Sequence, residues 1–156
     1  MRRRVISWLL VILWMGVIFY LSHQQAVESN SLSTGITERI VAIIERVAFG
    51  IEVDLVHFNH LIRKSAHFFA YLVLGILVSN ALNSHGYAGF KLFWVAMGIC
   101  VLYAISDEVH QLFVPGRAGQ VRDVLIDSAG AVVGIGGFLA VLGLSGRLRK
   151  SDAGKI

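Results

Sequence analysis

Residues 124–144 read VLIDSAGAVVGIGGFLAVLGL, an apolar run in which Asp127 is the single charged residue. An α-helix needs about 20 predominantly apolar residues to cross the hydrocarbon core of a bilayer. The run therefore predicts a transmembrane helix. Three further stretches are similarly long and apolar, over about residues 5–22, 65–82 and 93–112. We predict an all-α membrane protein, a four-transmembrane-helix bundle that forms a single domain over residues 1–156.

The composition agrees with a membrane protein. Of the 156 residues, 56% are hydrophobic and 15% are charged, which is too apolar for an ordinary soluble domain of this size. The basic residues cluster at the two termini, so the formal net charge of +4 does not indicate a nucleic-acid partner. Cys100 is the only cysteine, which excludes an intramolecular disulfide and a zinc site built on cysteine pairs.

The distribution of positive charge predicts how the chain is oriented. Arg2, Arg3 and Arg4 precede the first span, and Lys91 lies between the second and third spans. The segment after the fourth span contains Arg147, Arg149, Lys150 and Lys155. Because cytoplasmic segments carry an excess of Lys and Arg, we expect both termini in the cytoplasm. The segments that contain Arg63 and Arg117 then face outside.

An amphipathic helix is predicted between the first and second spans, on the outer face. Isoleucine and valine recur there at helical spacing, while glutamates seven residues apart mark the opposite side: Ile36, Ile40, Ile43, Ile44, Val47 and Ile51 against Glu38, Glu45 and Glu52. We expect this helix to lie in the membrane interface. The alternative is a lid over a polar site.

Ionisable side chains gather where the third and fourth spans meet. Residues 106–117 read SDEVHQLFVPGR, and Asp123 and Asp127 follow. A charged side chain near the centre of a membrane helix costs roughly 2.5–3.5 kcal/mol, so such clusters usually have a function. Pro115-Gly116 favours a turn that ends the third span.

Helical spacing predicts that these side chains converge. Asp107 and Gln111 share one helical face, and so do Lys64 and His67 at the start of the second span. In the fourth span the face of Asp123 and Asp127 continues with Gly130, Gly134 and Gly137. Small residues allow helices to approach closely, so we expect this face to be buried in the bundle or, alternatively, to support an oligomer. The aspartates then point towards one outer pocket.

The side-chain types indicate two sets of candidate residues. Carboxylates and imidazoles act as general acids and bases, so the catalytic candidates are Asp107, Glu108, His110 and Asp123. Cationic and amide groups bind phosphate, which gives the ligand-binding candidates Lys64, His67, Gln111, Arg117 and Arg122. Asp127 is included with them as a neighbouring carboxylate.

A purely structural alternative remains, in which these charges neutralise one another. Glu108 would then pair with Arg117 or Arg122, and Asp123 with Lys64. Another alternative is that Asp107, Glu108, Asp123 and Asp127 hold a hard cation through their oxygen atoms. The sequence identifies no cofactor. The sequence contains no Gly-rich phosphate loop and no Gly-x-Ser-x-Gly elbow. It also lacks the Lys…Arg-Pro and Pro-Ser-Gly-His signatures of well-known lipid phosphatases.

The chain resembles the VanZ-like family over nearly its whole length. The resemblance rests on residues 19–22 with Gln24, on Arg63-Lys64 with His67 and Tyr71, on the block from Asp107 to Arg117, and on residues 123–134. Many relatives have asparagine where this chain has Asp127. The resemblance implies an integral membrane protein of the bacterial cell envelope and links it to tolerance of the glycopeptide teicoplanin, without an agreed reaction. The alternative is an outer-leaflet enzyme that acts on a phospholipid or a lipid-linked cell-wall precursor.

Overall fold

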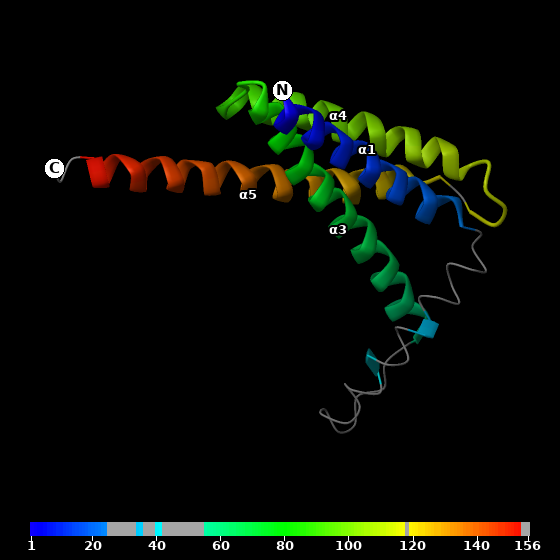
Figure 1. Cartoon of the computed structure of the whole chain (residues 1–156). Helices are drawn as coiled ribbons and strands as arrows, with labels where there is room; N and C mark the ends of the chain where they lie inside the picture. Colours follow the sequence, from blue (N-terminus) through cyan, green and yellow to red (C-terminus); the bar gives the residue numbers. More distant parts are fainter. Residues whose placement is uncertain (25–33, 36–39, 42–54, 118, 154–156) are drawn as a thin grey trace.

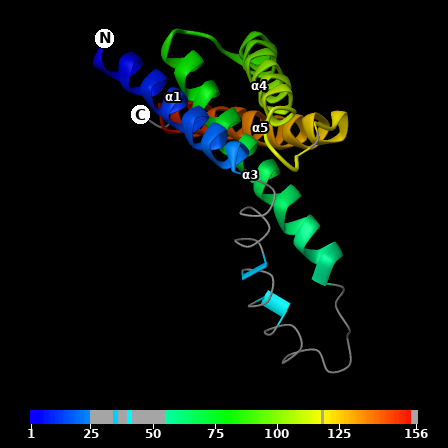
Figure 2. The same cartoon turned by 90° about the vertical axis from the view of Figure 1, so that its right-hand side faces the viewer.

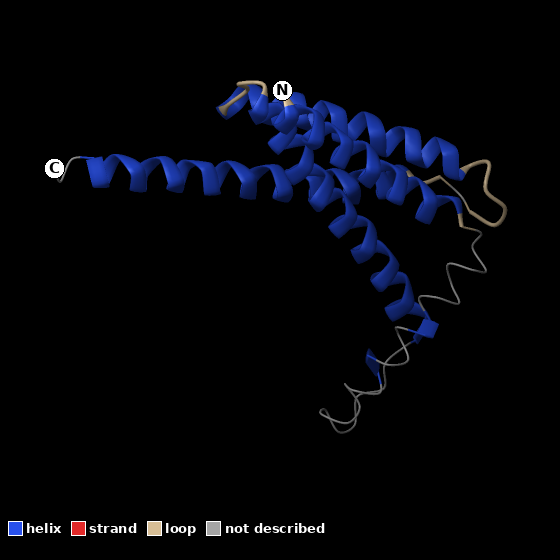
Figure 3. Cartoon of the chain, viewed as in Figure 1, coloured by secondary structure: helices blue, strands red, loops and turns tan. Residues whose placement is uncertain are grey.

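The computed structural model describes residues 1–24, 34–35, 40–41, 55–117 and 119–153. This part of the chain is helical and contains no strand (Figures 1 and 3). Its long helices are α1 (Arg2–His23), α3 (Leu55–Ser84), α4 (Gly89–Gln111) and α5 (Val121–Ala153). Each contains a stretch long and apolar enough to cross a membrane: Arg2–His23, Leu61–Ser84, Gly89–Gln111 and Val121–Leu144. The prediction of an all-α protein with four membrane-spanning helices is therefore confirmed, and the chain is a multi-pass membrane protein.

Glycines with positive φ angles mark the connections. Gly86 (φ 88°) lies between α3 and α4, Gly89 (φ 52°) is the first residue of α4, and Gly116 (φ 75°) lies between α4 and α5. The Arg117 N–H donates to the Val114 carbonyl at 3.1 Å across the predicted Pro115-Gly116 turn. Glycine suits this position because a β-carbon disfavours positive φ. The amphipathic helix predicted over residues 36–51 falls largely outside the described residues and stays a prediction.

The helices pack with α3 and α5 crossing one another and α1 and α4 lying alongside (Figures 1 and 2). Their shared core consists mainly of small and aliphatic side chains: Val11, Ile18, Leu74, Val78, Leu92, Ala96, Cys100, Ala104, Ala131 and Ile135, with Tyr71. The Trp14 indole N–H donates to the Ala70 carbonyl at 2.8 Å, which docks α1 on α3. The Tyr103 hydroxyl donates to the Met15 carbonyl at 2.5 Å, which docks α1 on α4.

Glycine permits an unusually close contact between α5 and α3. A Cβ atom at Gly130 would lie 2.1 Å from the Phe68 carbonyl oxygen, and one at Gly134 would lie 2.0 Å from that of Leu72. On α3, a Cβ atom at Gly75 would lie 2.7 Å from the Ala131 carbonyl oxygen. Any larger residue would collide with main chain, so these glycines set the helix separation.

The burial predicted for the glycine face is confirmed at Gly130 and Gly134 but is wrong at Gly137. Gly137 is exposed, and a Cβ atom there would meet nothing within 4 Å. The reason is the crossing angle, because α5 diverges from α3 beyond their contact (Figure 1). Because α3 covers Gly130 and Gly134, only Gly137 of these three glycines is exposed and could contact a second copy of the chain. An oligomer formed through this face stays a prediction.

The two ends of the bundle differ in chemistry. At one end the Arg4 guanidinium donates to the Ser84 carbonyl at 2.9 Å, and the Trp8 indole N–H donates to His85 Nε2 at 3.2 Å. The N-terminus of α1 therefore lies beside the α3–α4 connection. The C-terminal ends of α1 and α4 meet α3 and the start of α5 at the opposite end, which we call the polar end.

Candidate functional site

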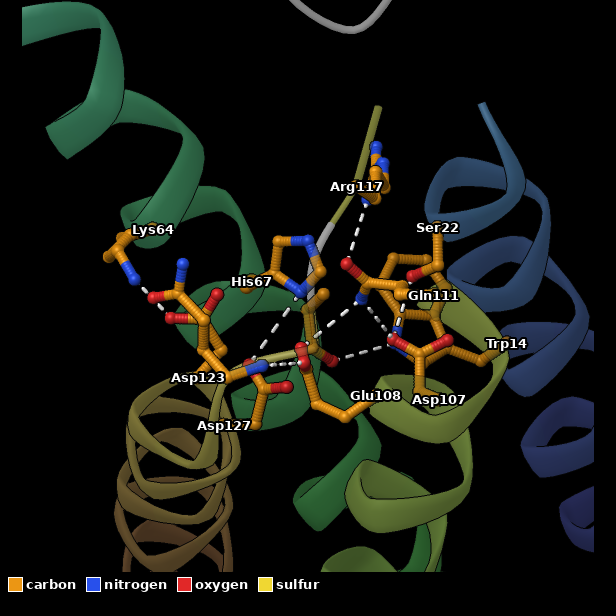
Figure 4. A network of polar contacts seen from close by, with 12 residues as sticks. Trp14, Ser22, Lys64, His67, Asp107, Glu108, Gln111, Arg117, Asp123 and Asp127 are labelled. Atoms are coloured by element: carbon orange, nitrogen blue, oxygen red, sulfur yellow. Dashed lines mark hydrogen bonds and ion pairs between the residues drawn. The ribbon is translucent and has the colours of Figure 1, made fainter. Parts of the chain in front are cut away.

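A pocket of about 220 Å³ opens at the polar end. It is lined by Arg63, Lys64, His67, Gln111, Gly116, Arg117, Gln120, Asp123 and Ile126. These residues come from α3, the end of α4, the α4–α5 connection and the first turns of α5 (Figure 4). The convergence of three separate segments on one pocket, expected from helical spacing, is present.

Lys64 and Asp123 form an ion pair in the pocket wall. Their side chains are 16% and 26% exposed, so the pair is partly shielded from solvent. The structural pairing of Asp123 with Lys64 is therefore present. It neutralises the one carboxylate among the lining residues and ties α3 to α5 beside the pocket.

Asp107 lies behind the pocket in a buried hydrogen-bond network. The residue is 2% exposed, and its carboxylate accepts a hydrogen bond from the Ser22 hydroxyl at 2.7 Å. The Gln111 side-chain amide donates to Asp107 Oδ2 and to Glu108 Oε1, both at 3.3 Å. Asp107 Oδ1 has no hydrogen-bond partner. Ser22 thus joins the end of α1 to this network.

Glu108 holds the connection between α4 and α5. Its Oε2 accepts a hydrogen bond from the Gln120 main-chain N–H at 2.7 Å. The suggested ion pair with Arg117 or Arg122 is not formed in the part of the chain that the structure describes. The reason is that its carboxylate is turned towards Gln111 and the loop main chain. Glu108 does not line the pocket.

Arg117 reaches across the pocket from the α4–α5 connection. Its Nη1 donates to Gln111 Oε1 at 3.2 Å and its Nη2 to the Leu21 carbonyl at 3.3 Å. Burial lowers the pKa of the Arg117 guanidinium, and the nearby positive charge of Arg63 lowers it further. An arginine remains protonated at physiological pH, so two like charges face the same pocket.

His67 and Asp127 form the deepest part of the site. Asp127 Oδ1 lies 3.7 Å from His67 Nδ1, and Asp127 is fully buried. Neither carboxylate oxygen of Asp127 has a hydrogen-bond partner. His67 lines the pocket, whereas Asp127 lies behind it (Figure 4). The imidazole therefore stands between the pocket and a buried carboxylate.

Comparison with known proteins identifies the family of this chain. The sequence profile of the family described as VanZ/LLP1 matches residues 7–142, nearly the whole chain. The chain belongs to the VanZ/LLP1 family. The resemblance inferred from the sequence is thereby confirmed. A search of curated proteins and a search of solved structures each find no similar protein.

Two candidate residues of this VanZ/LLP1 protein lie away from the pocket. His110 Nε2 lies 3.2 Å from His23 Nδ1, and the His110 ring stacks on Phe19 with centroids 4.4 Å apart. Arg122 is exposed and is not among the residues that line the pocket. Helical rotation explains both positions, since each residue lies on a different face of its helix from the pocket-facing side chains.

Arg63, which forms a basic pair with Lys64 and was expected from the sequence to suit phosphate or carboxylate, also lines the pocket. Two further residues of the site of this VanZ/LLP1 protein were not predicted. Gln120 contributes its main-chain N–H, for which the sequence has no signal, and Ser22 is brought in by the packing of α1. Among the described residues no group of three or more His, Cys, Asp or Glu is arranged to hold a metal ion.

Proposed function

We propose that this VanZ/LLP1 protein binds the phosphate group of a membrane lipid in the pocket at the polar end. The observation that carries the proposal is the position of Arg63, Lys64 and Arg117, which come from distant parts of the sequence and line one pocket. Clustered guanidinium and ammonium groups suit phosphate, because their hydrogen bonds to it are charge-assisted. Gln111 and His67 supply further polar groups.

The surroundings of the pocket suit a ligand that remains in the membrane. Phe113 and Val121, at the two ends of the α4–α5 connection, are 80% and 81% exposed. Large apolar side chains at the end of membrane-spanning helices favour insertion into the lipid interface. A lipid phosphate lies at this depth, so it can enter the pocket while its hydrocarbon chains stay in the bilayer.

The pocket faces outside in the proposed orientation. Arg2, Arg3, Arg4 and Lys91 lie at the opposite end of the bundle, which the positive-inside tendency assigns to the cytoplasm. Both termini are then cytoplasmic, and the lipid is bound in the outer leaflet of a bacterial cell membrane.

The expected consequence for the cell envelope is glycopeptide tolerance. The resemblance to VanZ links the family to teicoplanin, which acts at the outer surface on lipid-linked cell-wall precursors. A protein that binds envelope lipids there can alter how the antibiotic reaches its target. The alternative is an outer-leaflet enzyme that acts on a phospholipid or a lipid-linked cell-wall precursor, and the pairing of His67 with buried Asp127 favours it.

Lipid binding is tested by titrating the purified protein in detergent with dioctanoyl phosphatidic acid. Hydrogen bonds to charged groups contribute about 1.5–3 kcal/mol. We therefore expect Arg117→Ala to weaken binding by about 10-fold to 100-fold. Arg2→Ala, at the opposite end, is the matched control and should bind like the wild type. Equal affinities for Arg117→Ala and the wild type would contradict the proposal.

Tolerance is tested in a sensitive bacterial host that expresses the wild type, Arg117→Ala or Arg2→Ala at matched membrane levels. We expect the wild type and Arg2→Ala to raise the inhibitory concentration of teicoplanin more than that of vancomycin. Arg117→Ala should remove the effect. A host whose susceptibility does not change with the wild type would show that the tolerance phenotype does not extend to this chain.

A further inference from the structure

Close packing of α5 on α3 fixes the position of His67. Gly130 contacts the main chain of Phe68, the residue directly after His67. Asp127 precedes Gly130 by almost one helical turn on α5, so this contact brings its carboxylate to within 3.7 Å of the imidazole. The main chains of both helices are packed against each other here, so the imidazole and the carboxylate are held by the fold itself.

The two ring nitrogens of His67 face different surroundings. Nδ1 faces the carboxylate of Asp127, and Figure 4 shows the other ring nitrogen on the side turned away from it. A carboxylate beside Nδ1 favours the tautomer with hydrogen on that nitrogen. The lone pair is then on Nε2, in the ring that lines the pocket.

The charge of the pocket indicates which kind of lipid phosphate it suits. Its volume of about 220 Å³ accommodates a phosphate group beside Arg63, Lys64 and Arg117. A terminal phosphate, as in a diacylglycerol phosphate or a polyprenyl phosphate, carries more negative charge than a phosphodiester. It is therefore the lipid phosphate that these three cations suit best.

We propose that the pocket hydrolyses lipid phosphate monoesters, with His67 as the catalytic base and Asp127 as the residue that positions it. The proposal rests on the lipid-phosphate binding proposed above and adds the reaction, the substrate class and the two roles. Attack of water on phosphorus is assisted by a base that takes a proton from the water and by cations that stabilise the negative charge on the phosphate oxygens. The pocket places a candidate base and three cations side by side.

The reaction consumes one water molecule. His67 Nε2 takes a proton from water as the water oxygen bonds to phosphorus, and the bond from phosphorus to the lipid oxygen breaks. The lipid oxygen takes up a proton from solvent at the pocket mouth, and the imidazolium returns its proton to solvent. The products are a lipid alcohol and inorganic phosphate. Arg63, Lys64 and Arg117 stabilise the charge that develops on the phosphate oxygens.

The experiment measures inorganic phosphate released by the purified full-length protein from dioctanoyl phosphatidic acid, with dioctanoyl phosphatidylglycerol as the diester control. General-base catalysis contributes about 100-fold to 10,000-fold. His67→Gln should therefore release phosphate at least about 100-fold more slowly. The matched control is His85→Gln, which changes an exposed histidine at the opposite end and should keep the wild-type rate.

Asp127→Asn tests the positioning role. It keeps the shape of the side chain but removes the charge behind the imidazole. We expect kcat to fall by about tenfold or more with KM within about threefold of the wild type, because bound substrate does not touch Asp127. A general loss of structure would instead lower the melting temperature and raise KM.

The possible results show whether hydrolysis alone, or binding as well, is contradicted. Wild-type protein that binds phosphatidic acid without releasing phosphate would overturn the hydrolysis and leave the binding intact. Release by His67→Gln at the wild-type rate, or cleavage of the diester as fast as the monoester, would also overturn it. Wild-type protein that binds no phosphatidic acid would overturn both proposals.

Discussion

Gly130 lies so close to Phe68 that a Cβ atom at residue 130 would be 2.1 Å from the Phe68 carbonyl oxygen. No side chain fits between these two main chains, so the helices touch directly at this point. The two residues that we propose carry the chemistry lie just before the contact, His67 on α3 and Asp127 on α5. The helix contact and the geometry of the site are therefore consequences of the same glycine.

Gly130→Ala should destabilise the protein and separate His67 from Asp127. The added methyl group collides with main chain, which cannot swing away as a flexible side chain can, and overpacking of this kind costs about 1–3 kcal/mol. The melting temperature in detergent should fall by several degrees. Gly137→Ala is the matched control, because nothing lies within 4 Å of a Cβ atom there. Equal melting temperatures for the two variants would contradict the close contact.

Ser22→Ala should weaken the attachment of α1 at the polar end. The Ser22 hydroxyl donates to Asp107 Oδ2 at 2.7 Å, and Asp107 Oδ1 already has no partner. Removing a donor from a buried carboxylate costs about 1–3 kcal/mol. We expect a lower free energy of unfolding in a chemical denaturation series. Ser106→Ala serves as the control, since the exposed Ser106 hydroxyl bonds only to a carbonyl of its own helix. If both variants unfold alike, the Ser22–Asp107 bond does not stabilise the bundle.

Glu108 should act through the α4–α5 connection rather than on the ligand. Its Oε2 accepts the Gln120 N–H at 2.7 Å, and this connection carries Arg117. In Glu108→Gln the amide oxygen can still accept that hydrogen bond, so affinity for dioctanoyl phosphatidic acid should stay within about threefold of the wild type. Glu108→Ala removes the acceptor and should weaken binding about tenfold, as one lost charge-assisted hydrogen bond of about 1.5 kcal/mol implies.

Hydrogen exchange at the Gln120 amide provides the direct check. Protection should be retained in Glu108→Gln and lost in Glu108→Ala. Equal affinity for the two variants would show that the carboxylate does not hold the connection in place. A stronger loss in Glu108→Gln than in Glu108→Ala would instead indicate that Glu108 itself transfers a proton or contacts the ligand.

Part of the candidate site could be predicted from periodicity. The spacing of Lys64 with His67, and of Asp123 with Asp127, indicates which side chains share a helical face. Those pairs do face one another across α3 and α5 in the structure. Periodicity does not indicate which neighbouring helix a face meets, so it did not predict the contact that His110 makes. His110 lies beside His23 of α1, 87 residues earlier in the chain, and not among the residues that line the pocket.

The sequence by itself determined the class of fold and the positions of its spans, because the apolar length needed to cross a bilayer is a local property of each segment. It also indicated that Asp107, Glu108, Asp123 and Asp127 would gather at one end, since they lie where the third span ends and the fourth begins. Only the tertiary structure decided which of them meet. The crossing at Gly130 and Gly134 sets the rotation of α5 against α3, and the Glu108–Gln120 bond sets the path of the loop that carries Arg117. Both depend on contacts between residues distant in sequence, which no local pattern encodes.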